Sequence, residues 1–117
     1  MSSRSVVMYR THRVGKTLIL SLTGQLTGRG NVRWLDHLSM ARPLPPRVIV
    51  DLGAVTCVDR KGAEALVDAY IATTLRAGCL ALTRPTVLVS RQLEYFGVSR
   101  LVPTLRRAAA SSTGGDW

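Results

Sequence analysis

The sequence contains few residues that could cross-link a fold or hold a metal. Its only cysteines, Cys57 and Cys79, lie in separate apolar segments and form neither a Cys-x-x-Cys unit nor a zinc-ligand spacing with His12 and His37. We therefore expect two buried free thiols, two surface histidines and no metal site. A chain of 117 residues can bury a sufficient core without disulfides or metals.

Long apolar runs are also missing. Charged residues, proline or glycine interrupt every run well before the roughly 20 residues that a membrane-spanning helix needs. The short run from Thr17 to Leu22 follows Arg13 and Lys16, but no small-residue cleavage site comes after it, so we read no signal peptide. The expectation is a cytoplasmic protein with no membrane span.

Acidic residues are scarce: seven stand against sixteen lysines and arginines, which gives a net charge of +9. This balance suits an acidic protein, nucleic acid or an anionic membrane surface as partner. The basic residues are scattered, however, with pairs only at Arg60-Lys61 and Arg106-Arg107, and arginine richness is equally consistent with the coding bias of a GC-rich genome. Aromatic residues are few and do not alternate with basic ones, which argues against nucleic acid.

Sequence motifs of common enzymes are absent. There is no Gly-x-Gly-x-x-Gly and no Gly-x-x-x-x-Gly-Lys-Ser/Thr to cradle a nucleotide phosphate. Asp51 and Asp59 could form an acid/base pair, but a turn at Asp51 and a helix cap at Asp59 explain them more simply. Lys61 as a Schiff-base nucleophile would need desolvation, which the first turn of a helix does not provide. We expect no catalysis, no cofactor and no small-molecule substrate.

The apolar pattern predicts strands at the start and in the middle of the chain. β-prone runs at 5–10 and 16–22 flank a polar segment that ends in glycine, which suggests a hairpin. The segment 24–30 reads as a loop that leads into a short helix capped by Asn31. A proline-rich segment then crosses over in extended form, and Arg47 to Leu52 suits a strand buried on both faces.

The second half of the sequence alternates helix and strand. Apolar residues three or four apart after Asp59 predict a helix that stops at Gly78, and Cys79 to Thr83 predicts a strand. A further helix is predicted from Pro85 to Gly97. This order implies an α/β domain: a mixed sheet of four to five strands with parallel inner strands, covered by three to four helices. Binding sites tend to lie beyond the carboxyl ends of such strands, which points to the loop at 56–62.

Three motifs, in this order along the chain, resemble the STAS domain, the fold of bacterial anti-sigma factor antagonists. Gly24-Gln25-Leu26-Thr27 stands at the place of a Gly-Glu-Leu-Asp turn, and Leu93-Glu94-Tyr95-Phe96-Gly97-Val98 at the place of Leu-x-x-x-Gly-Leu. Between them, Val48-Ile49-Val50-Asp51-Leu52 followed by Val58-Asp59-Arg60-Lys61-Gly62 resembles an apolar strand, Asp-Leu and Asp-Ser-Ser-Gly. The resemblance covers about Val6 to Leu105 and implies a STAS-like domain at 1–107, while the Ser- and Gly-rich composition of 108–117 predicts a flexible tail.

The resemblance also implies a protein-binding role. STAS antagonists bind an anti-sigma factor that is also a serine kinase, and the Ser or Thr before the glycine of Asp-Ser-Ser-Gly accepts the phosphate. Here that position is Lys61 and its neighbour is Arg60, and neither carries a hydroxyl. Thr27 replaces the aspartate of the family's turn, and the nearby hydroxyl of Thr56 is more simply packed than phosphorylated. The implied protein keeps the fold and loses the phosphorylation switch.

We therefore expect a partner-binding surface around the start of the helix that follows Asp59. Its expected members are Thr27, Thr56, Asp59, Arg60, Lys61, Gly62 and Glu64. The expected partner is an anti-sigma factor of the serine-kinase type, bound by a monomer or weak homodimer. Two other interpretations stay open: a scaffold module of a stress-signalling or transporter-associated complex and, with less support, a basic nucleic-acid-binding domain.

Overall fold

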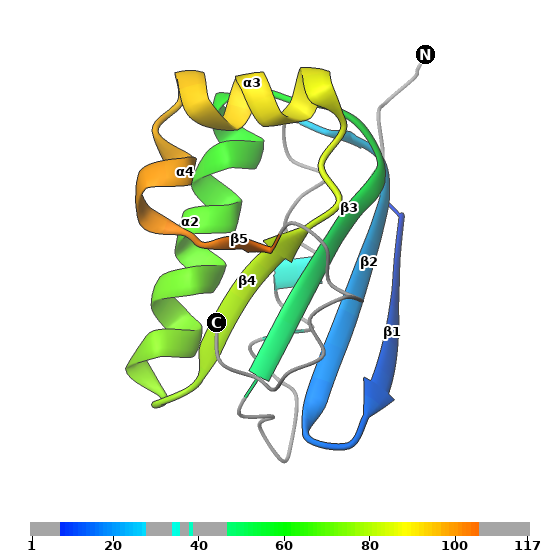
Figure 1. Cartoon of the computed structure of the whole chain (residues 1–117), viewed down its shortest axis with the longest axis vertical. Coiled ribbons are helices and arrows are strands. Elements are labelled where there is room, and N and C mark those ends of the chain that lie inside the picture. The colour runs from blue at the N-terminus through cyan, green and yellow to red at the C-terminus, as the bar shows by residue number, and fades with distance from the viewer. Residues whose placement is uncertain (1–7, 28–33, 36–37, 39–46, 106–117) are drawn as a thin grey trace.

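A five-stranded mixed sheet organises the described part of the chain, with strand order β1-β2-β3-β4-β5. β1 (Met8–Val14) runs antiparallel to β2 (Thr17–Leu26), and β3 (Arg47–Val58), β4 (Cys79–Thr83) and β5 (Thr104–Leu105) continue the sheet in parallel (Figure 1). This architecture confirms the predicted α/β fold. The computed structural model describes residues 8–27, 34–35, 38 and 47–105.

Three helices come after the inner strands in the sequence. α2 (Arg60–Leu75) follows β3, and α3 (Val87–Tyr95) and α4 (Val98–Leu101) follow β4. Figure 1 shows α2 and α4 on the β4 side of the molecule and α3 across the top of the view, with β1 at the far edge of the sheet. The first predicted helix is described only at three helical residues, Trp34, Leu35 and Leu38. The rest of that helix, the proline-rich segment and the tail at 108–117 lie outside the described residues.

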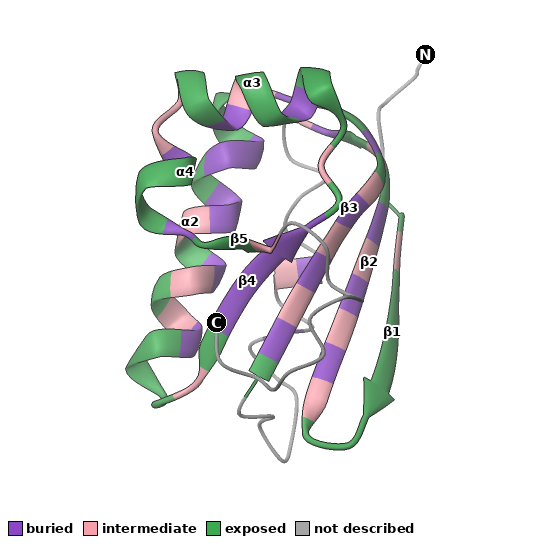
Figure 2. Cartoon of the chain, in the orientation of Figure 1, coloured by how far each residue is buried: buried purple, intermediate pink, exposed green. Residues whose placement is uncertain are grey.

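One face of the sheet carries the core. Leu18 and Leu20 of β2 pair with Val48 and Val50 of β3, and all four are at most 5% exposed. The residues between them are less buried, so β2 and β3 show alternating bands in Figure 2. The expectation that β3 is buried on both faces is therefore wrong. Burial in β3 alternates with a period of two although its sequence is continuously apolar, because the half-buried Ile49 lies on the face away from the core.

The strand ends also differ from the predicted bounds. β1 runs through the polar residues up to Val14, and the turn is Gly15-Lys16, with Gly15 at φ 61°. Gly24 belongs to β2 and not to a loop, because β2 pairs with β3 as far as Leu26. Pairing with a neighbouring strand satisfies the backbone hydrogen bonds of polar and apolar residues alike, so side-chain character marks strand ends poorly.

The two cysteines are free thiols but not the buried ones that we expected. Cys57 is half-buried and Cys79 is exposed. Cys79 is the first residue of β4 and pairs with the exposed Arg47, the first residue of β3, so it lies at an end of the sheet that the core does not cover. His12 is exposed on β1, as expected, and His37 is outside the described residues.

The helix α2 ends in a Schellman motif in which alanine takes the left-handed position. Ala77 has φ 64°, its N–H donates to the Thr74 carbonyl at 2.9 Å, and the Gly78 N–H donates to the Thr73 carbonyl at 2.9 Å. The predicted stop at Gly78 is one residue late, because these two hydrogen bonds require the positive φ at the residue before it. A left-handed conformation costs an L-residue roughly 1–2 kcal/mol.

We expect the change Ala77→Gly to raise the free energy of unfolding by about 0.5–1 kcal/mol, because glycine adopts a positive φ without steric cost. Ala72→Gly, inside α2, is the matched control and should lower the same quantity by about 0.5–1 kcal/mol. Urea denaturation of the two variants measures both changes. A similar loss of stability in both would contradict this account of the helix end.

Candidate functional site

The start of α2 is joined to the end of β2. Asp59 is the N-cap residue: its carboxylate accepts a hydrogen bond from the Gly62 N–H at 2.8 Å. Its own N–H donates to the Leu26 carbonyl at 3.3 Å. Asp59 thus pairs one of the N–H donors that a helix end would otherwise leave free, and ties that end to the last residue of β2. The cap predicted at Asp59 is confirmed.

Gly62 is required by this junction for steric reasons. It is buried in the first turn of α2, and a Cβ atom built on it would clash with the backbone carbonyl of Leu26. A carbonyl oxygen at the end of a paired strand cannot move aside as a flexible side chain can. Only glycine lets the first turn of α2 approach β2 this closely.

The two cations occupy the first two positions of α2 and point to solvent. Arg60 and Lys61 are both exposed, and the first turn contains no acidic residue. Because the N-terminus of a helix carries partial positive charge, cations there are mildly unfavourable and anions are stabilised. The start of α2 therefore combines two positive side chains with the positive end of a helix dipole, an arrangement that attracts a carboxylate or another anion.

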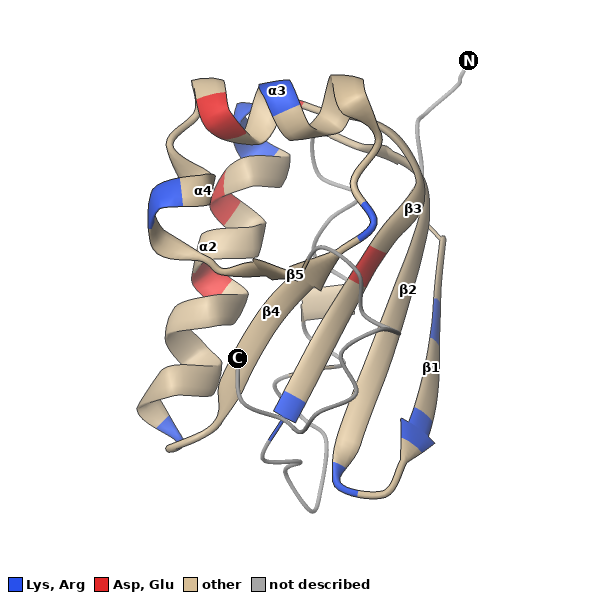
Figure 3. Ribbon diagram, in the orientation of Figure 1, with Lys and Arg blue, Asp and Glu red and all other residues tan. Residues whose placement is uncertain are grey.

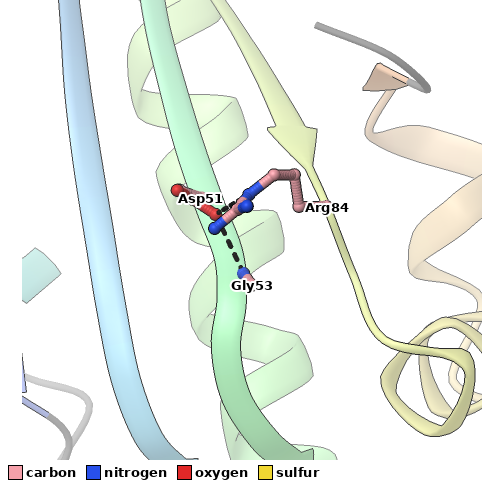
Figure 4. A network of polar contacts seen from close by, with 3 residues as sticks. All are labelled: Asp51, Gly53 and Arg84. Carbon is pink, nitrogen blue, oxygen red and sulfur yellow. Dashed lines mark hydrogen bonds and ion pairs between the residues drawn. The ribbon is translucent and has the colours of Figure 1, made fainter.

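The strand that leads into α2 is re-aimed by two irregularities. Between Asp51 and Ala54, β3 contains one residue more than the paired segment of β2, and Thr56 is a second extra residue. At the first, the Asp51 carboxylate accepts hydrogen bonds from the Gly53 N–H at 2.9 Å and from Arg84 Nε at 3.1 Å (Figure 4). A Cβ on Gly53 would meet the Arg84 guanidinium. Bulges of this kind turn a strand and change the direction of the side chains that follow.

The second irregularity exposes Thr56. Its hydroxyl donates to the Gly24 carbonyl at 3.3 Å, and the residue is exposed, so the expectation that Thr56 packs into the core is wrong. An extra residue in one strand shifts the alternation of inward and outward side chains, which the sequence pattern did not indicate. The expected loop at 56–62 is in fact the last three residues of β3, the cap Asp59 and the first turn of α2.

The remaining predicted site residues lie on the same end of the sheet. Thr27 is half-buried and directly follows β2, next to the junction with Asp59 and Gly62. Glu64 is exposed one turn after Arg60 on α2. The structure therefore places Thr27 beside the helix cap and places Glu64 on the solvent side of the helix.

No acid/base pair is formed by the two aspartates that flank this segment. The Asp51 carboxylate accepts hydrogen bonds from Gly53 and Arg84, and that of Asp59 accepts one from Gly62. Asp59 thus has the predicted role of a helix cap, whereas Asp51 lies at an irregularity inside β3 and not in the turn that we expected. In the described ranges, no group of three His, Cys, Asp or Glu side chains is placed to hold a metal ion. None of the described helices is long and apolar enough to span a membrane.

Sequence reasoning missed the contribution of α3. The Gln92 side chain accepts a hydrogen bond from the Val58 N–H at 2.8 Å and so holds the last residue of β3. Tyr95 and Phe96, whose rings meet edge to face with centroids 5.1 Å apart, line a groove of about 600 Å³ together with Arg60 and Glu64 of α2. Contacts between residues so far apart in sequence leave no periodic signal.

The sequence profile of the STAS domain matches residues 5–111. The chain belongs to the STAS domain family. No curated protein sequence matches this STAS domain significantly. Its backbone is similar to that of the anti-sigma factor antagonist SpoIIAA in its unphosphorylated form, with a TM-score of 0.74, 16% identity, and coverage of 88% of this chain and 92% of the other.

Two further solved structures show how widely the fold is used. An anti-sigma factor antagonist from Mycobacterium paratuberculosis has a TM-score of 0.71 and 16% identity over 89% of each chain. The STAS domain of a SulP transporter from Vibrio cholerae has a TM-score of 0.64 and 16% identity over 85% of this chain and 80% of the other. At such identities the likeness shows the fold alone, which antagonists and transporters share.

We expect Gly62→Ala to lower the free energy of unfolding by about 1–3 kcal/mol, because the added methyl group must push α2 away from the Leu26 carbonyl. Glu64→Ala, at an exposed position on the same helix, is the control and should stay within about 0.5 kcal/mol of the unmodified domain. Thermal or urea unfolding followed by circular dichroism gives both values. Equal stability of the two variants would show that the junction is not tight.

Proposed function

We propose that this STAS domain binds an anti-sigma factor of the serine-kinase type through the exposed start of α2, and that phosphorylation at position 61 does not control the complex. The observation that carries this proposal is the placement of Lys61, a residue without a hydroxyl, on the solvent side of the first helical turn. The likeness to anti-sigma factor antagonists supports the choice of partner.

The charge of this surface defines what the partner must present. Arg60 and Lys61 lie at the positive end of the α2 dipole, so the complementary group on the partner is a carboxylate. The net charge of +9 would speed the encounter with an acidic surface through long-range attraction. Thr56 is exposed at the end of β3 that leads to these cations, and its hydroxyl, which donates to the Gly24 carbonyl, can still accept a hydrogen bond from the same partner.

The lack of a hydroxyl at position 61 makes the proposed binding constitutive. A phosphate would add about −1.5 to −2 charge units at the start of α2 and would repel an acidic partner surface. Lysine cannot accept phosphate from a serine kinase, and its own charge has the opposite sign. In this proposal the amount of the protein, and not its modification, sets how much partner is bound.

A second candidate function rests on the likeness to the STAS domain of a SulP transporter. In that case the domain would be a scaffold module in a transporter-associated or stress-signalling complex. Proteins that co-purify with it separate the two candidates, since the first requires an anti-sigma factor and the second a transporter or a large assembly. A gel-shift assay over a salt series tests the remaining possibility of nucleic-acid binding, which must weaken steeply with salt.

We expect Lys61→Glu to weaken the complex with the cognate anti-sigma factor at least about tenfold, because it places a carboxylate opposite a carboxylate. Lys16→Glu makes the same change of net charge at the hairpin turn and is the matched control. Isothermal titration calorimetry measures both dissociation constants. If the two variants bind equally well, the start of α2 is not the contact surface.

We expect Lys61→Ser to restore phosphorylation by the cognate kinase and, once phosphorylated, to lose the partner. The unmodified domain should incorporate no phosphate under the same conditions, because its residues at positions 60 and 61 have no hydroxyl. Intact-protein mass spectrometry after incubation with kinase and ATP reports both. Phosphate found on Thr27 or Thr56 of the unmodified domain would overturn the claim of constitutive binding.

A further inference from the structure

The groove between α2 and the α3–α4 junction has an apolar floor that ends in an exposed aromatic ring. Ala63 is 4% exposed and Val98 is 1% exposed, while Val67 and Phe96 are half-buried along the groove. Tyr95 is 83% exposed at its rim and rests its ring edge-to-face on Phe96. An exposed tyrosine held by a neighbouring ring is typical of residues that dominate binding at protein interfaces.

Three of the five acidic residues of the described chain lie along or next to this groove. Asp51 is ion-paired with Arg84 and Asp59 caps α2, and the other three described acidic residues lie along or next to the groove. Glu64 and Asp68 line it from α2, and Glu94 immediately precedes Tyr95 in α3. Figure 3 shows these acidic positions on α2 and α3.

The groove carboxylates have no cationic partner in the part of the chain that the structure describes. Glu64 and Asp68 are one helical turn apart and both exposed, and neither forms an ion pair with a described residue. Two like charges at this spacing disfavour a helix. In a chain with a net charge of +9, two such carboxylates beside an apolar floor point to a positively charged group supplied from outside.

We propose that this groove binds a basic amphipathic segment of a partner protein. A lysine or arginine of the segment pairs with Glu64 and Asp68, and its apolar side chains cover Val67 and Phe96 and contact Tyr95. The rest of the domain is predominantly basic and repels such a segment, which restricts it to the groove. A second copy of this chain is disfavoured as the occupant, because two chains of charge +9 repel each other at long range.

The inference deepens the proposed function, on which it rests for the idea of a protein partner. Arg60 lies at one end of the groove next to Lys61, so anion-attracting and cation-attracting sites follow one another along α2. A partner that fits both presents a carboxylate to the start of the helix and a basic, apolar element to the groove. The two sites of opposite charge along α2 fix the orientation of the bound partner, because a partner bound the other way round would place like charges together.

Two synthetic peptides of about 15 residues, roughly four helical turns, test the groove without the natural partner. Both carry the same leucine pattern, and one carries lysine where the other carries glutamate. We expect titration of the ¹⁵N-labelled domain with the lysine peptide to shift the amide signals of Glu64, Val67, Asp68 and Phe96. The glutamate peptide should leave these signals unchanged. Equal shifts with both peptides, or lysine-peptide shifts confined to other residues, would overturn the proposal.

Variants of the domain separate charge from packing. The double change Glu64→Gln with Asp68→Asn keeps the shape and removes the charges, and it should weaken lysine-peptide binding about tenfold. Tyr95→Ala should weaken it by a similar factor of about ten. Leu75→Ala, at an exposed residue of α2 outside the groove, is the control and should bind as the unmodified domain does. Unchanged binding by the double variant, with its amide spectrum still that of the folded domain, rules out recognition by these carboxylates.

The outcome can be told apart from that of the proposed function. If Lys61→Glu disrupts the complex with the anti-sigma factor and the lysine peptide does not shift the amide signals of the groove, the groove inference fails and the proposed function stands. If the peptide binds the groove while Lys61→Glu leaves the anti-sigma factor bound, the proposed contact at the start of α2 fails and the groove remains a docking site.

Discussion

The close contact between the first turn of α2 and the last residue of β2 is the constraint on which the candidate site depends. The Leu26 carbonyl accepts a hydrogen bond from the Asp59 N–H and lies where a side chain on Gly62 would have to be. A helix held this tightly at its N-terminus projects its first two side chains in a defined direction. Arg60 and Lys61 are therefore presented by a rigid element, which suits a surface that must meet a partner in one orientation.

Two further interactions bring the end of β3 into this junction. At the first irregularity of β3, Asp51 accepts hydrogen bonds from the Gly53 N–H and from Arg84, whose backbone is left-handed with φ 59°. Gln92 of α3 then holds the N–H of Val58 at the strand's last residue. The sheet, α2 and α3 thus converge on one end of the molecule. The same convergence forms the groove beside the cations, so the two candidate contact surfaces share one supporting structure.

Local sequence signals predicted the elements whose cause is local. Asp59 stands three residues before Gly62, whose N–H its carboxylate accepts, which is the local pattern of an N-cap. β4 has the predicted bounds because it consists of a short, mostly apolar run. Predictions failed where distant segments decide. The buried positions of β3 depend on its register with β2. Thr56 is exposed because β3 has an inserted residue there, and Cys79 is exposed because it lies at the end of the sheet.

Residue types and spacings were sufficient to predict the family, the order of β1, β2, β3, α2, β4 and α3, and the two cations without a hydroxyl at the start of a helix. Those features are written in residue types and spacings of a few positions. Three features came from the folded arrangement alone: Leu26 requires a glycine at position 62, Gln92 holds the end of β3, and Glu64 and Asp68 border an apolar groove with Tyr95. Each of these depends on residues brought together across the fold, and packing forces between distant segments leave no periodic pattern in the chain.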